Sequence, residues 1–213
     1  MRLLLIGAPG SGKGTQATRL AEHFGLTHIS SGDLLRQHVT EGTPLGKEVR
    51  QYVAHGDLVP DTLLMDVLRK PVVAASKSGG YILDGFPRTV EQAEIAYAVA
   101  KDLGVEAQVA VHLDVAREEL VRRLLARGRG SDDTEEVIEH RLEVYMEHTV
   151  PMLDEHEERL QDFWSQRYWI AIAQQESPAG IYRKRPELVG RRQWLVHGPG
   201  QIRRKTKAAC KDL

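Results

Sequence analysis

An apolar run leads directly into a glycine-rich loop near the start of the chain, and this junction constrains the fold more than any other feature. Leu3 to Ile6 are four consecutive apolar residues, as in a strand that is buried on both faces. Directly after them comes the loop Gly7-Ala8-Pro9-Gly10-Ser11-Gly12-Lys13-Gly14-Thr15, and a helix is predicted over 13–24. A loop of this kind between a strand and a helix cradles phosphate groups with its backbone N–H groups and its lysine. The junction therefore predicts a phosphate-binding α/β fold.

Short apolar runs and amphipathic stretches alternate over residues 1–158. Further strands are predicted at 81–83 and 109–113, with a weaker candidate at 27–29. Because proline cannot continue a regular helix, we expect one helix to end before Pro71 and another to break or kink at Pro151. The alternation predicts βαβ units, and hence a three-layer α/β fold with a parallel central sheet and helices on both faces. The helices are predicted over 13–24, 33–39, 44–54, 60–69, 90–103, 117–126 and 134–157.

Composition excludes several classes of protein. The chain has 213 residues and a single cysteine, Cys210, which rules out an internal disulfide framework and a multi-cysteine zinc site. No apolar run approaches the roughly 18 residues that a membrane helix needs. We therefore expect a cytoplasmic protein that has no membrane contact and binds no zinc.

The last quarter of the chain differs in charge from the rest. Residues 159–213 hold 4 acidic and 12 basic residues and all three tryptophans, whereas the whole chain has a net charge of −1. Such a divergent basic tail fits either a segment that binds polyanions or a solvated extension, and the extension is the simpler interpretation.

Arginines recur at 36, 88, 123, 127, 129 and 141. Phosphoryl transfer between two nucleotides brings many negative charges together, so its site needs lysine, several arginines and Mg²⁺ more than a strong base. Arg123 and Arg127 are one helical turn apart and can face the same phosphates. Arg88 and Gln92 have the same spacing, which can set a guanidinium on an acceptor phosphate and an amide on its base. Any one of these arginines alone would fit a surface salt bridge, so the inference depends on the complete set.

The glycine-rich loop resembles the P-loop of adenylate kinases and their nucleoside-monophosphate kinase relatives, whose form is Gly-x-Pro-Gly-x-Gly-Lys-Gly-Thr. Taken together with this loop, four further blocks make the resemblance specific, and it covers about residues 1–158. The blocks are, in order, Ser30-Ser31-Gly32-Asp33-Leu34-Leu35-Arg36, Gly56-Asp57-Leu58-Val59-Pro60-Asp61, Asp84-Gly85-Phe86-Pro87-Arg88-Thr89 followed by Gln92, and Arg129 with Asp132-Asp133 and Arg141.

The resemblance implies a fold and a reaction. It implies a P-loop domain over 1–158 with five strands in the order 2-3-1-4-5, an AMP-binding segment near 30–60 and a short lid near 127–137. The implied reaction converts ATP and AMP to two ADP with Mg²⁺, in a monomer that needs no protein partner. A UMP/CMP or GMP kinase is the alternative within the family. A catalytically impaired nucleotide-binding protein is the alternative if the tail disrupts the fold.

Roles for individual residues also follow from the resemblance. Asp84 resembles the carboxylate that holds Mg²⁺ through water, and Asp33 either assists or serves only as a helix-capping and ion-pairing residue. ATP would be bound by Gly10, Ser11, Gly12, Lys13, Gly14, Thr15, Arg123, Arg127 and Gly200. AMP would be bound by Ser31, Arg36, Asp57, Leu58, Val59, Gly85, Phe86, Pro87, Arg88, Gln92, Arg129 and Arg141. The catalytic set would be Lys13, Arg88, Arg123, Arg129 and Arg141.

Gly14 follows the lysine where the common P-loop has Ser or Thr, so the hydroxyl is displaced to Thr15. The chain departs from the family pattern at two places. Gly130 and Ser131 add a residue between Arg129 and the paired aspartates, which puts the register of Arg129 in doubt. Relatives end in one more strand and helix. In the tail, 168–172 and 193–196 each fit a strand, and 202–213 fit a basic helix. Either an insertion places the family's last strand and helix at 194–196 and 202–213, or the tail is foreign and the last strand is missing.

Overall fold

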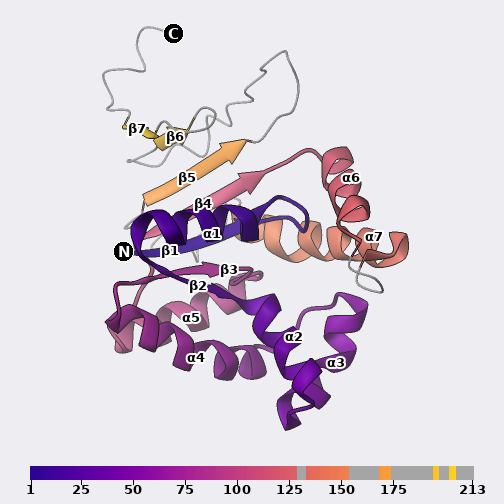
Figure 1. Ribbon diagram of the computed structural model, residues 1–213, viewed down its shortest axis with the longest axis horizontal. Coiled ribbons are helices and arrows are strands. Elements are labelled where there is room, and N and C mark those ends of the chain that lie inside the picture. Colours follow the sequence, from indigo (N-terminus) through magenta and orange to yellow (C-terminus); the bar gives the residue numbers. More distant parts are fainter. Residues whose placement is uncertain (129–132, 154–167, 174–193, 197–201, 205–213) are drawn as a thin grey trace, which may run out of the picture.

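The computed structural model describes residues 1–128, 133–153, 168–173, 194–196 and 202–204, and the last three ranges are described only as backbone. Its centre is a parallel sheet in the order β2-β3-β1-β4-β5 (Figure 1). The order of the first four strands is the predicted one. The strands are β1 (Arg2–Gly7), β2 (Thr27–Ser30), β3 (Tyr81–Asp84), β4 (Val109–Asp114) and β5 (Tyr168–Ala173).

Side-chain alternation along β1 explains the three layers. Leu4 and Ile6 pack into a core on one face, together with apolar residues of the helices α4 (Asp61–Lys77) and α5 (Val90–Asp102). Leu3 and Leu5 pack into a second core on the other face, against Ala17 of α1 (Lys13–Phe24). Figure 1 shows α1 on one side of the sheet and α4 and α5 on the other. Because both faces of the strand are covered, its apolar run is continuous.

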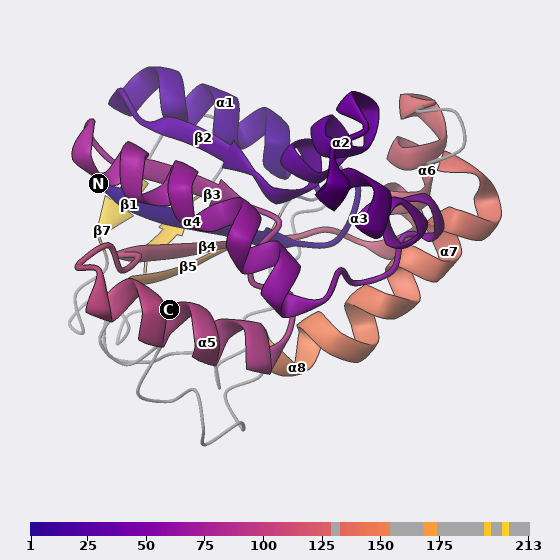
Figure 2. The same ribbon diagram turned by 90° about the horizontal axis from the view of Figure 1, so that it is seen from below.

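Helices α2, α3, α6 and α7 lie beyond the carboxyl ends of the strands in both views (Figures 1 and 2). In open α/β sheets this is the edge at which ligands bind. No helix within the described ranges is long and apolar enough to cross a membrane. The helices are α1 (Lys13–Phe24), α2 (Ser31–Glu41), α3 (Pro44–His55), α4 (Asp61–Lys77), α5 (Val90–Asp102), α6 (Arg117–Arg127), α7 (Glu135–Val144), the π-helical turn η2 (Tyr145–Thr149) and α8 (Val150–Leu153).

Helix α4 corrects one prediction. It continues through Pro71 to Lys77 instead of ending before the proline. Pro71 cannot donate to the carbonyl one turn earlier, which costs a hydrogen bond. The apolar face of the helix continues past it, with Val67 and Ala75 both buried against the sheet. Packing of that face therefore outweighs the missing hydrogen bond.

The helix predicted over 134–157 is interrupted near the expected place. Regular α7 gives way to the wider turn η2, and Pro151 lies in the first turn of the following α8. A π turn changes the hydrogen-bond spacing ahead of a residue that has no N–H to donate. Residues 154–157 lie outside the described part of the chain.

The tail corrects the prediction for the last strand. Residues 194–196 (β6) do not join the main sheet but pair antiparallel with 202–204 (β7) in a sheet of two strands. The prediction of a helix over 202–213 is therefore wrong for residues 202–204. The strand beside β4 is β5, which pairs in parallel register along all of Val109–Asp114 and leaves no vacant fifth position. Gly200 and residues 205–213 lie outside the described residues.

Candidate functional site

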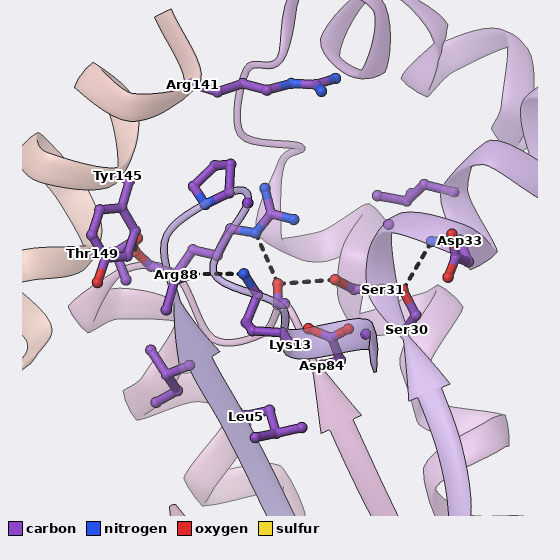
Figure 3. Close-up of a pocket in the computed structure, with 18 of the residues that line it drawn as sticks. Leu5, Lys13, Ser30, Ser31, Asp33, Asp84, Arg88, Arg141, Tyr145 and Thr149 are labelled. Carbon is purple, nitrogen blue, oxygen red and sulfur yellow. Dashed lines mark hydrogen bonds between the residues drawn. The ribbon is translucent and has the colours of Figure 1, made fainter. Parts of the chain in front are cut away.

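A cavity of about 780 Å³ opens at the carboxyl edge of the sheet (Figure 3). Its volume is typical of sites for small-molecule ligands. Among the described residues that line it, six have cationic side chains and three have carboxylates. The cations are Lys13, Arg36, Arg88, Arg123, Arg127 and Arg141, and the carboxylates are Asp33, Asp57 and Asp84. The cavity therefore has the charge of an anion-binding site.

The glycine-rich loop forms the floor of the cavity between β1 and α1. Gly10 and Gly12 have φ values of +82° and +90°, which side chains rarely adopt. A Cβ at Gly10 would lie 2.9 Å from Cγ of Leu124 and 3.0 Å from the carbonyl oxygen of Leu120. Glycine at this position thus lets the loop pack closely against α6.

Lys13 opens α1 and folds back over the loop. Its Nζ donates to the carbonyl oxygens of Gly7 at 2.7 Å and Ala8 at 2.9 Å. The pKa of Lys13 is lowered to about 8, chiefly by burial. Asp84 opposes this shift, and the charges of Arg88 and Arg127 add to it. A phosphate group placed here would stabilise the charged amine.

Two residues assigned to nucleotide contact lie behind the cavity wall. Ser11 is fully buried, and its Oγ finds no hydrogen-bond partner among the described residues. Its backbone N–H donates to Ala8 at 3.1 Å. Phe86 packs into the core beneath α4 and α5. Neither side chain is one of the described residues that line the cavity.

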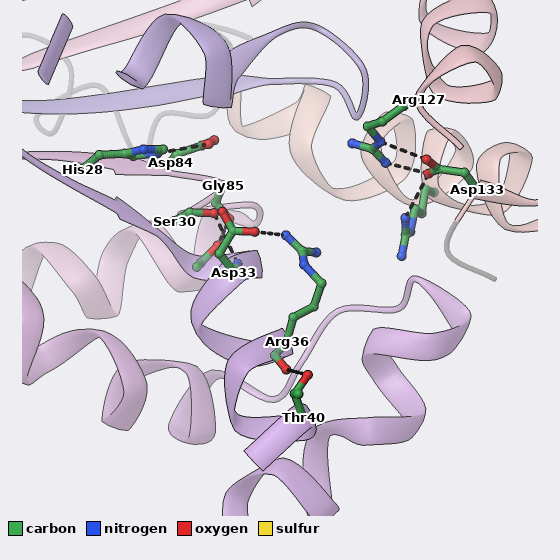
Figure 4. A network of polar contacts seen from close by, with 11 residues as sticks. His28, Ser30, Asp33, Arg36, Thr40, Asp84, Gly85, Arg127 and Asp133 are labelled. Atoms are coloured by element: carbon green, nitrogen blue, oxygen red, sulfur yellow. Dashed lines mark hydrogen bonds and ion pairs between the residues drawn. The ribbon is translucent and has the colours of Figure 1, made fainter. Parts of the chain in front are cut away.

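Asp84 ends β3 directly beside the loop. Its side chain is 10% exposed, and one oxygen lies 3.6 Å from Nε2 of His28 on the neighbouring strand (Figure 4). The same carboxylate lies 3.7 Å from the position that a Cβ would take at Gly14, so the small residue leaves room between carboxylate and helix. Mg²⁺ commonly uses one or two carboxylates, several waters and substrate phosphates. Asp84 fits that donor set.

Asp33 is engaged within α2. Its Oδ1 forms an ion pair of 2.5 Å with Arg36, and its backbone N–H donates to Oγ of the N-cap Ser30 at 3.2 Å (Figure 4). The capping and ion-pairing interpretation of this residue is therefore confirmed, and any part in metal binding stays a prediction.

The turn after β3 fixes Arg88. Its Nε donates to the carbonyl oxygen of Gly85 at 2.8 Å, and Oγ of Ser31 donates to the same oxygen at 2.9 Å (Figure 3). Thr149 of η2 donates to the carbonyl oxygen of Arg88 at 2.8 Å. Burial lowers the pKa of Arg88, and Asp84 partly offsets the effect. These contacts hold a desolvated guanidinium at the cavity.

Helix α7 contacts the loop between α3 and α4. Nη2 of Arg141 donates to the carbonyl oxygen of Val53 at 3.3 Å. The aliphatic part of the Arg141 side chain occupies the space that a side chain at position 56 would need, so glycine is required there. Nε2 of His140 lies 2.6 Å from Oδ1 of Asp57. Asp57, Leu58 and Val59 also line the cavity, and their contact with AMP stays a prediction.

The two arginines of α6 that line the cavity, Arg123 and Arg127, are held by carboxylates. Arg123 forms an ion pair of 2.5 Å with Glu119. Hydrogen bonds from Arg122 and Arg123 lower the pKa of Glu119 to about 2. Arg127 donates to both oxygens of buried Asp133, at 2.9 and 2.6 Å (Figure 4). Arg123 and Arg127 line one cavity, as the one-turn spacing predicts. Arg129 lies outside the described residues.

Some cavity residues carry no motif signal. Among them are His28, Tyr145 and Thr149, the last two from η2. His28 could have been found from the strand period, because it lies two residues before Ser30 on the same face. Nothing in the sequence marks the π-helical turn that brings Tyr145 and Thr149 to the cavity.

Comparison with known proteins assigns the chain that carries this site to a family. The family model for adenylate kinase matches residues 5–161. The chain belongs to the adenylate kinase family. It is 49% identical over 158 residues to an adenylate kinase of Synechococcus sp. (strain RCC307), an alignment covering 74% of this chain and 85% of that protein. It is 45% identical over 161 residues to an adenylate kinase of Mycobacteroides abscessus, covering 76% and 88% respectively. The adenylate kinase match ends close to where the charge of the chain changes.

Proposed function

We propose that this chain catalyses reversible phosphoryl transfer from Mg-ATP to AMP, giving two ADP. Membership of the adenylate kinase family supports the reaction. The observation that carries the proposal is that Lys13 of the loop and Arg88 of the opposite turn line one cavity. Phosphoryl transfer needs two phosphate groups held in line and little acid–base chemistry, and a cavity with cations on both sides meets that need.

The loop is the donor side of this proposal. Backbone N–H groups over 10–15 and the positive end of the α1 dipole would hold the β- and γ-phosphates of ATP. Lys13 would exchange its two carbonyl contacts for phosphate oxygens. Because those contacts are to neutral acceptors and the amine is desolvated, a phosphate is the stronger partner.

Arg88 and Arg36 are the acceptor side. Arg88 is anchored through Nε on Gly85, which leaves its Nη atoms to meet the phosphate of AMP. Arg36 would leave Asp33 for the same phosphate. The turn at Gly85 and the loop at Asp57–Val59 would enclose the base, and Gln92 would read it.

Mg²⁺ would be held by Asp84 through water and by the phosphates of ATP. When bound, the ion neutralises charge that develops on the transferring group. The protein's own part is to place one buried carboxylate at the end of β3 next to the loop. Asp33 lies farther out on α2 and would assist only after releasing Arg36.

Arg123, Arg127, Arg129 and Arg141 would stabilise the transferring phosphoryl group. The described members of this set are already paired, and phosphate oxygens would compete with their carboxylate partners. We propose that the segments near 30–60 and 127–137 close over the nucleotides, which would exclude water and suppress ATP hydrolysis. We also propose that β5 serves as the family's last strand, and that the protein is a cytoplasmic monomer.

An acceptor panel tests this function. Purified full-length protein is mixed with Mg-ATP and each of AMP, UMP, CMP and GMP, and diphosphate formation is followed. We expect turnover with AMP. Turnover with another acceptor alone would contradict the choice of substrate while leaving the class of reaction intact.

Arg88 provides the matched test of the acceptor side. Arg88→Ala should lower kcat/KM for AMP by at least about 100-fold, because a desolvated charge-assisted contact is lost. ATP affinity should be nearly unchanged. Arg19→Ala, on the exposed face of α1, is the control for loss of an arginine. Unchanged AMP kinetics in Arg88→Ala would refute the assignment.

A further inference from the structure

Gln92 presents a buried amide to the acceptor side of the cavity. The residue is 2% exposed and lines the cavity. Its Oε1 accepts from the backbone N–H of Arg88 at 2.9 Å, and its Nε2 donates to Oδ1 of Asp61 at 2.9 Å. Asp61 is the first residue of α4 and is not one of the described residues that line the cavity.

These two partners permit one orientation of the amide. A backbone N–H can only donate, and an ionised carboxylate can only accept. Turning the amide by 180° would set Nε2 against the N–H of Arg88 and Oε1 against Asp61. Both contacts would then be repulsive in a buried place, where unsatisfied polar groups are costly. The assignment of O and N is therefore dictated by the neighbours.

A fixed amide can distinguish the two kinds of purine. The O atom accepts two hydrogen bonds and the NH₂ group donates two, so each has capacity for one more. Facing a base, this amide offers one acceptor and one donor. A 6-aminopurine is complementary to this amide, because it has an amino donor at C6 and an acceptor at N1. A 6-oxopurine in the same place offers a carbonyl oxygen at C6 and a donor at N1, and both are mismatched.

We propose that Asp61 is a positioning residue that fixes the amide of Gln92 and so makes the site select a 6-aminopurine over a 6-oxopurine acceptor. The inference depends on the proposed function, since it takes Gln92 to face the acceptor base. Without Asp61, only the N–H of Arg88 would oppose a turn of the amide, and a turned amide matches a 6-oxopurine because its two ends exchange roles. With Asp61 in place, the turn costs two contacts and the amide keeps the orientation that matches a 6-aminopurine.

The test compares two acceptors that differ at position 6 of the purine. Values of kcat/KM are measured for AMP and for IMP at saturating Mg-ATP, in the full-length protein. Asp61→Asn keeps the shape of the side chain, but its amide can present either oxygen or nitrogen to Gln92. The ratio of kcat/KM for AMP to that for IMP should fall by about tenfold, which corresponds to one mismatched hydrogen bond. Asp61→Ala removes the partner altogether and should lower the ratio in the same direction.

Asp66→Asn is the matched control, because it removes a carboxylate from the exposed face of the same helix. We expect its ratio to equal that of the wild type. A merely structural role for Asp61 would lower the melting temperature and slow both acceptors equally, and an unchanged ratio in the Asp61 variants would overturn the inference. Wild-type protein that is active with AMP separates that result from failure of the proposed function. No AMP turnover in the wild type would overturn both.

Discussion

Replacement of Gly10 by alanine separates the cost of backbone conformation from the cost of lost space. Gly10 has a φ of +82°, and an added Cβ would lie 2.9 Å from Leu124 and 3.0 Å from the carbonyl oxygen of Leu120. Gly25, at the end of α1, has a similar φ of +65°, but nothing lies within 4 Å of its Cβ position. The two glycines thus share the strained conformation and differ in what surrounds them.

The expected magnitudes follow from that difference. A left-handed conformation costs an L-residue roughly 1–2 kcal/mol, so Gly25→Ala should lower the free energy of unfolding by about that amount. Gly10→Ala should add an overpacking cost of about 1–3 kcal/mol, because the backbone of α6 cannot move aside as a side-chain end can. Displacement of the loop should also weaken ATP binding by at least about tenfold, since small shifts in positioning groups have large effects.

Urea unfolding gives the stability of each variant, and isothermal titration calorimetry gives the ATP affinity. We expect Gly25→Ala to bind ATP as the wild type does. If Gly10→Ala equals Gly25→Ala in both stability and ATP affinity, close packing of the loop against α6 has no part in ATP binding, and the reasoning is refuted.

Two further predictions concern charge. Because burial lowers the pKa of Lys13 to about 8, the ligand-free amine is largely neutral at pH 9, and ATP should restore its charge. Calorimetry at this pH in two buffers of different ionisation enthalpy should therefore show proton uptake on ATP binding. Lys13→Met should abolish that uptake. Equal uptake in wild type and variant would contradict this. Asp133→Asn should lower the free energy of unfolding by about 1–3 kcal/mol, as measured by urea unfolding. This is less than the cost for a fully buried ion pair, because the Arg127 side chain is 34% exposed. A loss below about 0.5 kcal/mol would show that the Arg127–Asp133 pair contributes little to stability.

Local sequence rules predicted the first half of the fold well. The run Leu3–Ile6 and the helix over 13–24 were both placed correctly, because a strand covered on two faces and a helix ended by Gly25 leave clear patterns. The rule for proline failed at Pro71, where tertiary packing outweighs a local penalty. Such packing cannot be inferred from the residues next to the proline.

The site was predictable where its chemistry lies in contiguous motifs. The loop was identified by residue type and spacing, and the turn at Arg88 by its spacing to Gln92 together with the resemblance to adenylate kinases. The contact between Asp61 and Gln92 spans 31 residues, and that between His140 and Asp57 spans 83. Pairs so far apart are brought together by the packing of helices, and a single sequence holds no signal for them. The strand beside β4 was misplaced for the same reason, because several apolar runs of the tail fit an open sheet edge equally well.

The most direct test of the central claim runs the reaction backwards. Full-length protein is incubated with ADP and Mg²⁺ alone, and the phosphorus resonances of the nucleotides are followed by NMR. An enzyme that holds a donor and an acceptor nucleotide in one cavity should convert ADP to ATP and AMP in equal amounts. Folded protein that forms neither nucleotide, or that releases inorganic phosphate instead, would contradict the account.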